Sequence, residues 1–215
     1  MTKHMPSDER SAQILDAARA CFLEKGYFAT RVDEIARASG LSKGGVYFHF
    51  ESKRDIFWAL VEREYDRAMT FIDAVASSDA DVFTKIIQMG QHFTDLFSTT
   101  DNPRFMAIIG EMSLRDEELR RLIGQLQRSY VVKIAELIRT GIERGQFREV
   151  DAESVAFLLK ALVDGIQVSY ALEDDIDLGP IVPAAIDMIL HALQPASPPD
   201  HLSVIPPLSR RPGEG

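Results

Sequence analysis

The sequence is poor in several features that mark specialised classes of protein. Its 215 residues include a single cysteine, Cys21, so no disulfide can form within the chain and a reducing compartment is expected. Cys21 lies among the apolar positions of a helical pattern, which favours a small buried side chain over a redox sensor. The first residues lack the apolar segment of a signal peptide, and Lys160, Asp164 and Asp187 interrupt the most apolar stretches. We therefore expect a cytoplasmic protein that does not contact a membrane.

Familiar catalytic and metal-binding patterns are missing as well. The sequence contains no phosphate-binding loop, no Gly-x-Ser-x-Gly elbow, no dinucleotide fingerprint and no His or Cys pair at a metal-ligand spacing. We therefore expect no enzymatic activity, no cofactor and no bound metal. The scattered carboxylates fit helix caps and solvated helix faces.

The charge of the chain is acidic overall but unevenly distributed. The net charge is −9, which does not by itself indicate nucleic acid as a partner. Residues 1–54, however, carry nine Lys/Arg and seven Asp/Glu, a net charge of +2, which leaves −11 for the remainder. A basic N-terminal segment on an acidic body fits a contact surface confined to one end of the molecule.

Helical periodicity extends over nearly the whole of residues 7–193, and no strand pattern or internal repeat is visible. We predict an all-α protein of about nine helices, with a three-helix domain in residues 1–55 and a larger helical domain in residues 56–194. Residues 195–215 are rich in proline and are predicted to be disordered, with a polyproline ligand as the less favoured alternative. Helix starts are expected at the capping residues Thr30, Ser42, Ser52, Ser78, Asp116 and Asp151.

A helix-turn-helix pattern lies within residues 30–50. Ala36 places a small side chain on the first helix, Gly40 suits the left-handed turn, and Val46 fills the junction between the two helices. The remaining core positions of the pattern are Ile35, Leu41 and Phe50. The same turn chemistry also occurs in an αα-hairpin of an ordinary helical bundle, which does not touch DNA.

Two adjacent glycines, Gly44 and Gly45, stand in the first turn of the second helix of this pattern. Each costs a helix about 0.8–1 kcal/mol relative to alanine. Missing side chains at this place let the backbone approach the floor of a DNA major groove, whereas the alternative is a frayed first turn without function. The polar and basic side chains expected on the exposed side favour DNA: Lys43, Tyr47, His49, Lys53 and Arg54.

The stretch "FATRVDEIARASGLSKGGVYFHFESKRDIF" resembles the DNA-binding segment of the TetR family of bacterial transcriptional regulators. The resemblance is specific over about residues 10–58; elsewhere it concerns length, helical pattern and the helix end "ERGQF". It implies that the third helix reads DNA. The residues it places against bases are Lys43, Gly44 and Gly45, and those it places against the DNA backbone are Thr30, Ser42, Tyr47, His49 and Lys53. The family commonly has Thr, Ser or Ala at the position of Gly45, so base reading here is expected to rest more on Lys43 and on DNA shape.

The last two helical stretches, "VAFLLKALVDGIQVSYAL" and "IVPAAIDMILHAL", are apolar on more than one face. Such a helix is either central within its own domain or covered by a partner. The resemblance implies the second arrangement, a homodimer through a four-helix bundle formed by two copies of each helix. A dimer places two reading helices one DNA turn apart, roughly 34–36 Å, and so implies a palindromic operator.

The resemblance also implies a small-molecule effector that binds among the helices of the larger domain. The candidate ligand-binding residues are Met89, His92, Phe93, Met106, Ile109, Met112 and Tyr130. Stripes of methionine and aromatic residues also occur in ordinary cores. They favour a hydrophobic or aromatic compound whose polar groups meet His92, Gln127 or Tyr130, and the acidity of the body favours a neutral or cationic compound over an anion.

The expected function is therefore ligand-responsive regulation of transcription, with repression where the operator overlaps a promoter. The alternative is a helical interaction or dimerisation module without sequence-specific DNA binding. Lys43, Tyr47, His49 and Lys53 argue against this alternative, because the surface of an ordinary bundle does not require that set of side chains.

Overall fold

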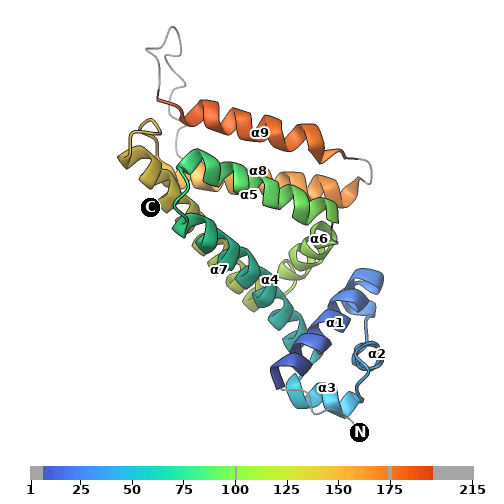
Figure 1. Ribbon diagram of the computed structural model, residues 1–215. Coiled ribbons are helices and arrows are strands. Elements are labelled where there is room, and N and C mark those ends of the chain that lie inside the picture. Colours follow the sequence, from blue (N-terminus) through green and yellow to red (C-terminus); the bar gives the residue numbers. More distant parts are fainter. Residues whose placement is uncertain (1–6, 100, 174–175, 196–215) are drawn as a thin grey trace, which may run out of the picture.

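The computed structural model describes residues 7–99, 101–173 and 176–195, and every regular element within them is an α-helix, which confirms the predicted class (Figure 1). The nine helices of these residues are α1 (Ser7–Ala29), α2 (Val32–Ala38), α3 (Lys43–His49), α4 (Lys53–Ser77), α5 (Val82–Thr99), α6 (Asn102–Ser113), α7 (Glu117–Glu143), α8 (Ala152–Leu172) and α9 (Leu178–Leu193). The prediction for the proline-rich segment 195–215 lies outside the described residues, apart from Pro195.

Four of the predicted helix caps are confirmed by hydrogen bonds. The Ser42 hydroxyl accepts from the Gly45 N–H at 3.0 Å, and the Ser52 hydroxyl accepts from the first turn of α4 in the same way. The carboxylates of Asp116 and Asp151 accept from the first N–H groups of α7 and α8. A side-chain acceptor at these positions satisfies a backbone donor that has no partner inside its helix.

Two predicted helix starts are wrong. Helix α2 begins after Arg31, not Thr30, and the Arg31 N–H donates to Glu34 Oε2 at 2.8 Å. Ser78 ends α4, and Asp81 begins α5 because its carboxylate accepts from the Thr84 N–H at 3.0 Å. Thr30 and Ser78 are residue types that favour caps, but a carboxylate nearby in the chain reaches the exposed N–H groups instead.

Helices α1, α2 and α3 form a small unit at one end of the molecule, called the head from here on (Figure 1). Gly40 takes the left-handed turn between α2 and α3 with a φ of 67°, as the pattern predicts. Val46 and Ile35 are fully buried at the junction. The first helix bends at Gly26, where φ is 77°, and continues for one further turn to Ala29.

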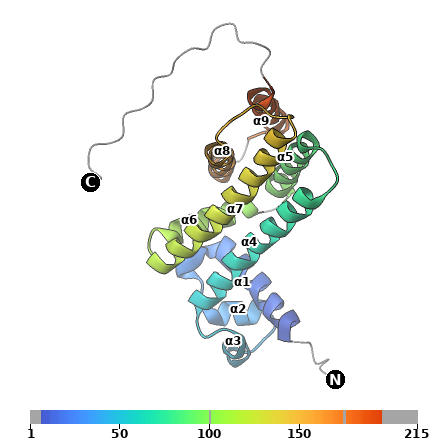
Figure 2. The same cartoon turned by 90° about the vertical axis from the view of Figure 1, so that its left-hand side faces the viewer.

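The head is joined to the rest of the chain by a continuous core rather than by a linker. Helix α4 runs through residue 55 without a break and extends along α7 (Figure 2). Phe57 of α4 packs edge-on against Phe22 of the head at 5.5 Å between ring centroids and against Phe105 of α6 at 6.1 Å. Movement of α4 must therefore move the head as well.

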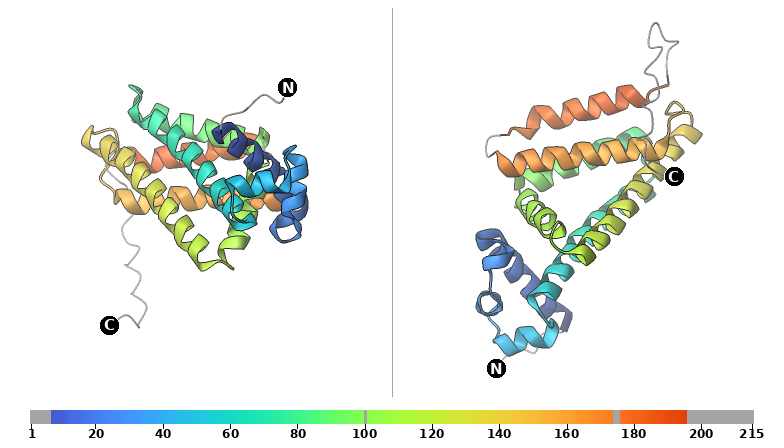
Figure 3. Two further views of the ribbon diagram at one scale, coloured as in Figure 1. Left: turned by 90° about the horizontal axis from the view of Figure 1, so that it is seen from below. Right: turned by 180° about the vertical axis from the view of Figure 1, so that it is seen from behind.

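Helices α8 and α9 lie at the end of the molecule away from α3 (Figures 1 and 3). Large apolar side chains are exposed along them: Phe157, Leu158, Val168, Leu172, Ile181 and Met188. By length and composition, α8 is also apolar enough to cross a membrane, in spite of Lys160 and Asp164, although core helices of water-soluble proteins meet the same criterion.

Candidate functional site

The exposed N-terminal half of α3 is the first candidate site. Ser42 caps the helix, and Lys43 follows with a side chain that is 57% exposed. The Lys43 ammonium lies 2.8 Å from Asp33 Oδ1, an ion pair that raises the pKa of Lys43 and lowers the pKa of Asp33. Because this pair is at the surface, it holds Lys43 only weakly and leaves the ammonium able to turn toward a base or phosphate.

Gly44 and Gly45 are open to the outside of the molecule. A Cβ atom built on Gly44 meets only Ser42 Oγ at 3.9 Å, and one built on Gly45 meets Ser42 Oγ at 3.4 Å and Leu41 Cβ at 3.6 Å. Neither glycine has a positive φ. Nothing in the described part of the chain therefore requires glycine at these positions.

Three aromatic side chains follow on the same helix. Tyr47 is exposed, and Phe48, which sequence reasoning missed, is 83% exposed. His49 contacts Ser11 Oγ through Nδ1 at 3.3 Å, so Nε2 is the ring nitrogen that can reach a phosphate. Phe48 lies one turn beyond Gly44 on the outward face, where an aromatic ring can contact a thymine methyl group. Its exposure follows from the burial of Val46, which fixes the orientation of the helix.

The structure corrects the prediction that Thr30 contacts the DNA backbone. The Thr30 side chain is 1% exposed, and its hydroxyl donates to the carbonyl oxygens of Gly26 at 2.8 Å and Cys21 at 3.1 Å. This hydroxyl satisfies carbonyl groups left open where α1 bends at Gly26. Thr30 therefore stabilises the head and does not offer a donor to DNA.

Lys53 also has a structural role, which its position in the sequence did not indicate. Its ammonium donates to the carbonyl oxygens of Tyr27 and Thr30 at 2.7 Å each and to that of Phe28 at 3.3 Å. The same group lies 4.4 Å from the centroid of the Tyr27 ring. Burial lowers the pKa of Lys53. The three N–H donors of the ammonium are thus used to hold the end of α1.

The substitution Lys53→Met is therefore expected to destabilise the fold by roughly 2 kcal/mol, since it leaves carbonyl groups without a charged donor. Urea denaturation measures this loss. Lys43→Met is the matched control, because the Lys43 side chain is exposed, and it is expected to change stability by less than about 0.5 kcal/mol. Equal stability of the two variants would contradict the structural role of Lys53.

The second candidate site is a cavity of about 500 Å³, partly open to solvent and bounded by α1 and α4 to α8. Five of the predicted ligand-binding residues line it: Met89, His92, Phe93, Met106 and Tyr130. The His92 ring stacks on Phe71 at 3.7 Å between centroids, and burial lowers its pKa, so the ring is neutral at pH 7. Burial also raises the pKa of Tyr130, which keeps its hydroxyl protonated.

Two predicted ligand-binding residues lie elsewhere. Ile109 and Met112 of α6 are 3% and 7% exposed and pack in the core shared with the head, so the prediction for them is corrected. Gln127 does not line the cavity either. Apolar periodicity marks the buried face of α6 but does not distinguish a core position from a cavity wall.

Sequence reasoning missed the charged end of the cavity. Arg19 of α1 and Arg63 and Arg67 of α4 line it together with the carboxylates of Asp16 and Glu64. Arg63 Nη1 pairs with Asp16 Oδ1 at 2.8 Å, and Glu64 Oε1 lies 3.3 Å from Arg67 and 3.8 Å from Arg19. These residues come from helices far apart in the sequence, so no local pattern indicates their meeting.

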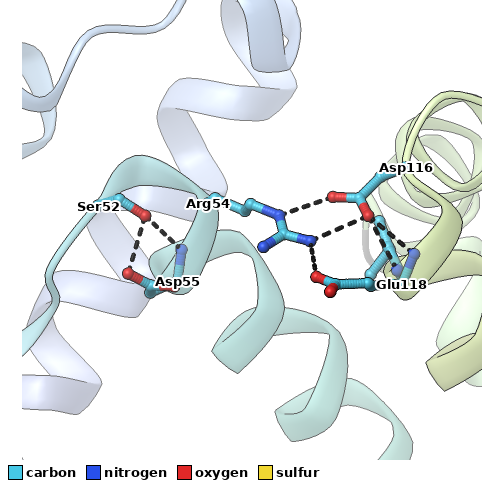
Figure 4. A network of polar contacts seen from close by, with 6 residues as sticks. Ser52, Arg54, Asp55, Asp116 and Glu118 are labelled. Carbon is cyan, nitrogen blue, oxygen red and sulfur yellow. Dashed lines mark hydrogen bonds and ion pairs between the residues drawn. The ribbon is translucent and has the colours of Figure 1, made fainter.

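A polar network ties the start of α4 to the start of α7 (Figure 4). Arg54 Nε and Nη2 donate to the two carboxylate oxygens of Asp116 at 2.7 and 3.0 Å, and Nη2 also donates to Glu118 at 2.5 Å. This arginine holds the pKa of Asp116 down to about 2. The guanidinium further lies over the Trp58 ring. Arg54 thus fixes α4 to the body and is occupied there instead of on DNA.

Comparison with known proteins agrees with this architecture. Residues 14–60 match the family described as bacterial regulatory proteins, tetR family, and residues 92–194 match the C-terminal domain of BetI-type transcriptional repressors. The chain is 30% identical over 170 residues to the transcriptional repressor BepR of Brucella suis, covering 76% of this chain and 81% of that protein.

Two solved structures have the same fold. The fatty acid degradation regulator FadR from Bacillus halodurans is 27% identical with a TM-score of 0.72, over 88% of this chain and 97% of that one. A protein from Saccharomonospora viridis in complex with choline is 24% identical with a TM-score of 0.77, over 88% and 100% of the two chains. The family matches, the identity to BepR and the helix-turn-helix geometry together show that this chain belongs to the TetR family of bacterial transcriptional regulators, a family of DNA-binding proteins without enzymatic activity.

Proposed function

We propose that this chain is a transcriptional repressor of the bacterial cytoplasm that binds a palindromic operator as a homodimer and is released by a small effector. The observation that carries the proposal is the exposed first turn of α3, where Gly44 and Gly45 leave the backbone bare beside Lys43. A bare backbone flanked by a lysine and a capping hydroxyl suits close approach to a major groove. The similarity to BepR, a transcriptional repressor, supports repression as the sign of regulation.

A homodimer through α8 and α9 is supported by the apolar surface of these helices. Phe157, Leu158 and Leu172 are 61%, 65% and 78% exposed, and only Ala152 and Ala156 of α8 are buried. Contiguous apolar surface of this kind marks an interface. A second copy of the chain covers it most simply, because one twofold operation buries the same face on both copies and matches an inverted repeat in DNA.

Helix α4 is the element that can carry a signal from the cavity to the reading helix. Arg63, Arg67 and Phe71 of its middle line the cavity, while its first turns carry Arg54 and Phe57 against the body and the head. If α4 can occupy two positions, a ligand that binds one of them more tightly shifts the equilibrium toward that position. The head, which is packed against α4, then moves with it. We infer that effector binding changes the spacing of the two reading helices through α4.

The experiment that tests DNA binding by the N-terminal end is a titration of the purified protein with duplex DNA over a range of salt concentrations. Contacts to phosphates predict a linear fall of log affinity with log salt, with a slope of roughly −0.9 per phosphate neutralised. Lys43→Ala is expected to lower affinity, whereas Lys133→Ala, which removes a half-buried lysine of α7 far from the head, leaves it unchanged. No binding even at low salt would favour the alternative of a helical interaction module.

A further inference from the structure

The direction of the exposed face of α3 is set by the buried residue of this helix. Val46 is fully buried against the rest of the head. With about 100° of turn per residue, the positions two residues before and after Val46 lie within about 20° of the opposite direction. These positions are Gly44 and Phe48. The centre of the exposed face therefore consists of bare backbone and, one turn further along, a phenyl ring.

This central strip of α3 is open to a partner. The Phe48 side chain is 83% exposed, more than any other phenylalanine among the described residues. Its ring meets the His49 ring edge-on at 5.3 Å between centroids. A Cβ built on Gly44 meets only Ser42 Oγ, at 3.9 Å. A group from outside can therefore lie over Gly44 and against the Phe48 ring without displacing a side chain of the described residues.

The hydrogen-bonding side chains of α3 are attached to either side of this strip. Lys43 and His49 are attached about 60° from the direction of Val46, and Tyr47 about 100° from it. The phenyl ring of Phe48, at the centre, has no hydrogen-bond donor or acceptor. A base that faces the centre of the helix must then be distinguished by apolar contact. The C5-methyl group of thymine is the apolar group that base pairs present in the major groove.

We propose that Phe48 is a specificity-determining residue whose ring packs against the C5-methyl group of a thymine in each half-site of the operator, with the bare backbone at Gly44 making room for that methyl group. The inference rests on the proposed function as a dimeric DNA-binding protein. It names the chemical feature of the bases that the centre of α3 recognises. The flanking side chains supply hydrogen bonds, whereas Phe48 supplies an apolar contact.

The probe is the duplex that the wild-type protein recovers from a random library, with each thymine replaced in turn by deoxyuridine in both half-sites. Uracil keeps the hydrogen-bonding groups of thymine and lacks only its methyl group. At the thymine that faces Phe48, the replacement is expected to weaken binding about fourfold per half-site, and so about fifteenfold for the pair. At the same position, 5-methylcytosine is expected to exceed cytosine by a similar factor. Fluorescence anisotropy measures these affinities.

Substitutions of Phe48 test whether its ring is the group that meets the methyl. Phe48→Ala is expected to bind the thymine and uracil duplexes equally, and Phe48→Leu, which keeps an apolar side chain, is expected to retain part of the preference. Phe28→Ala is the matched control. Phe28 is 59% exposed at the end of α1 in the same head, and its loss is expected to leave the preference intact. Binding of the uracil duplex shows that each variant is folded.

The dependence on salt separates a base contact from a phosphate contact. Phe48→Ala removes no charge, so it is expected to lower the affinity for the thymine duplex without changing the slope of log affinity against log salt. Lys43→Ala, in contrast, removes a cation. A Phe48→Ala variant whose slope falls by about one phosphate contact would contradict the assignment to a base.

Gly44→Ala tests where the methyl group lies. An alanine at this position places its own methyl where the thymine methyl is expected, so the variant is expected to lose more affinity on the thymine duplex than on the uracil duplex. Removal of one methyl group thus makes room for the other. Equal losses on the two duplexes would contradict the placement of the thymine methyl beside Gly44.

Three further results would overturn the proposal: wild-type protein that binds every uracil duplex as tightly as the parent duplex, a Phe48→Ala variant that keeps the preference for thymine, or a Phe28→Ala variant that loses it. The library selection separates this inference from the proposed function. An enriched inverted repeat whose binding does not depend on a methyl group defeats the inference alone. Enrichment of no sequence defeats the proposed function and the inference with it.

Discussion

Leu158→Arg is expected to convert a dimeric protein into a monomer and to lower operator affinity by about a hundredfold or more, because a single reading helix loses the effective concentration supplied by its partner. The Leu158 side chain is 65% exposed on α8, so the arginine is compatible with the fold of one chain. In an apolar interface between copies, the same arginine is a buried charge without a partner. Light scattering after size-exclusion chromatography measures the oligomeric state.

The matched control for this substitution is Leu114→Arg. Leu114 is 84% exposed at the end of α6, away from the apolar face of α8 and α9, and its replacement is expected to leave a dimer of wild-type affinity. A Leu158→Arg variant that remains dimeric would show that α8 is not the interface. A wild-type protein that is monomeric but binds lipid vesicles would assign the apolar face of α8 to a membrane instead.

Gly44→Ala and Gly45→Ala are each expected to raise the stability of the protein and to weaken operator binding at least tenfold. The stability gain is up to about 1 kcal/mol per substitution, since both glycines are helical and an added Cβ meets only ordinary contacts inside the chain. The loss of affinity follows from a methyl group placed between the α3 backbone and the groove. Urea denaturation and fluorescence anisotropy on operator DNA measure the two effects.

Gly110→Ala is the control that separates the gain in stability from the loss of operator affinity. A Cβ on Gly110 of α6 has no neighbour within 4 Å, so this variant is expected to gain stability in the same way without any change in DNA affinity. Alanine variants at positions 44 and 45 that bind operator as well as wild type would mean that the two glycines do not serve close approach to DNA. The first turn of α3 would then be an ordinary helix end.

Local patterns predicted the head well because its geometry depends on residues close together in the sequence. Gly40 takes the left-handed turn, Val46 fills the junction, and Ser42 caps α3 through a hydrogen bond three residues away. Each of these features follows from backbone chemistry within one turn of helix.

Roles that depend on distant partners were not predictable in this way. Lys53 was assigned to DNA on its residue type, but its ammonium reaches carbonyl groups 23 to 26 positions earlier in the chain. Arg54 pairs with Asp116, 62 positions away, and Arg63 meets Asp16 across two helices. The sequence shows that such residues are charged, and helical periodicity shows on which face of a helix each lies. The partner of each side chain depends on how the helices pack, which these patterns do not give.

Selection of duplex DNA from a random library by the wild-type protein is the measurement that decides whether this chain reads DNA as a dimer. Enrichment of an inverted repeat whose half-sites lie about one helical turn apart is the expected result. Lys43→Ala is expected to select the same repeat with relaxed preference at the bases that Lys43 meets. Enrichment of no sequence, both before and after the protein is unfolded and refolded to remove a bound effector, would contradict the assignment of α3 as a reading helix.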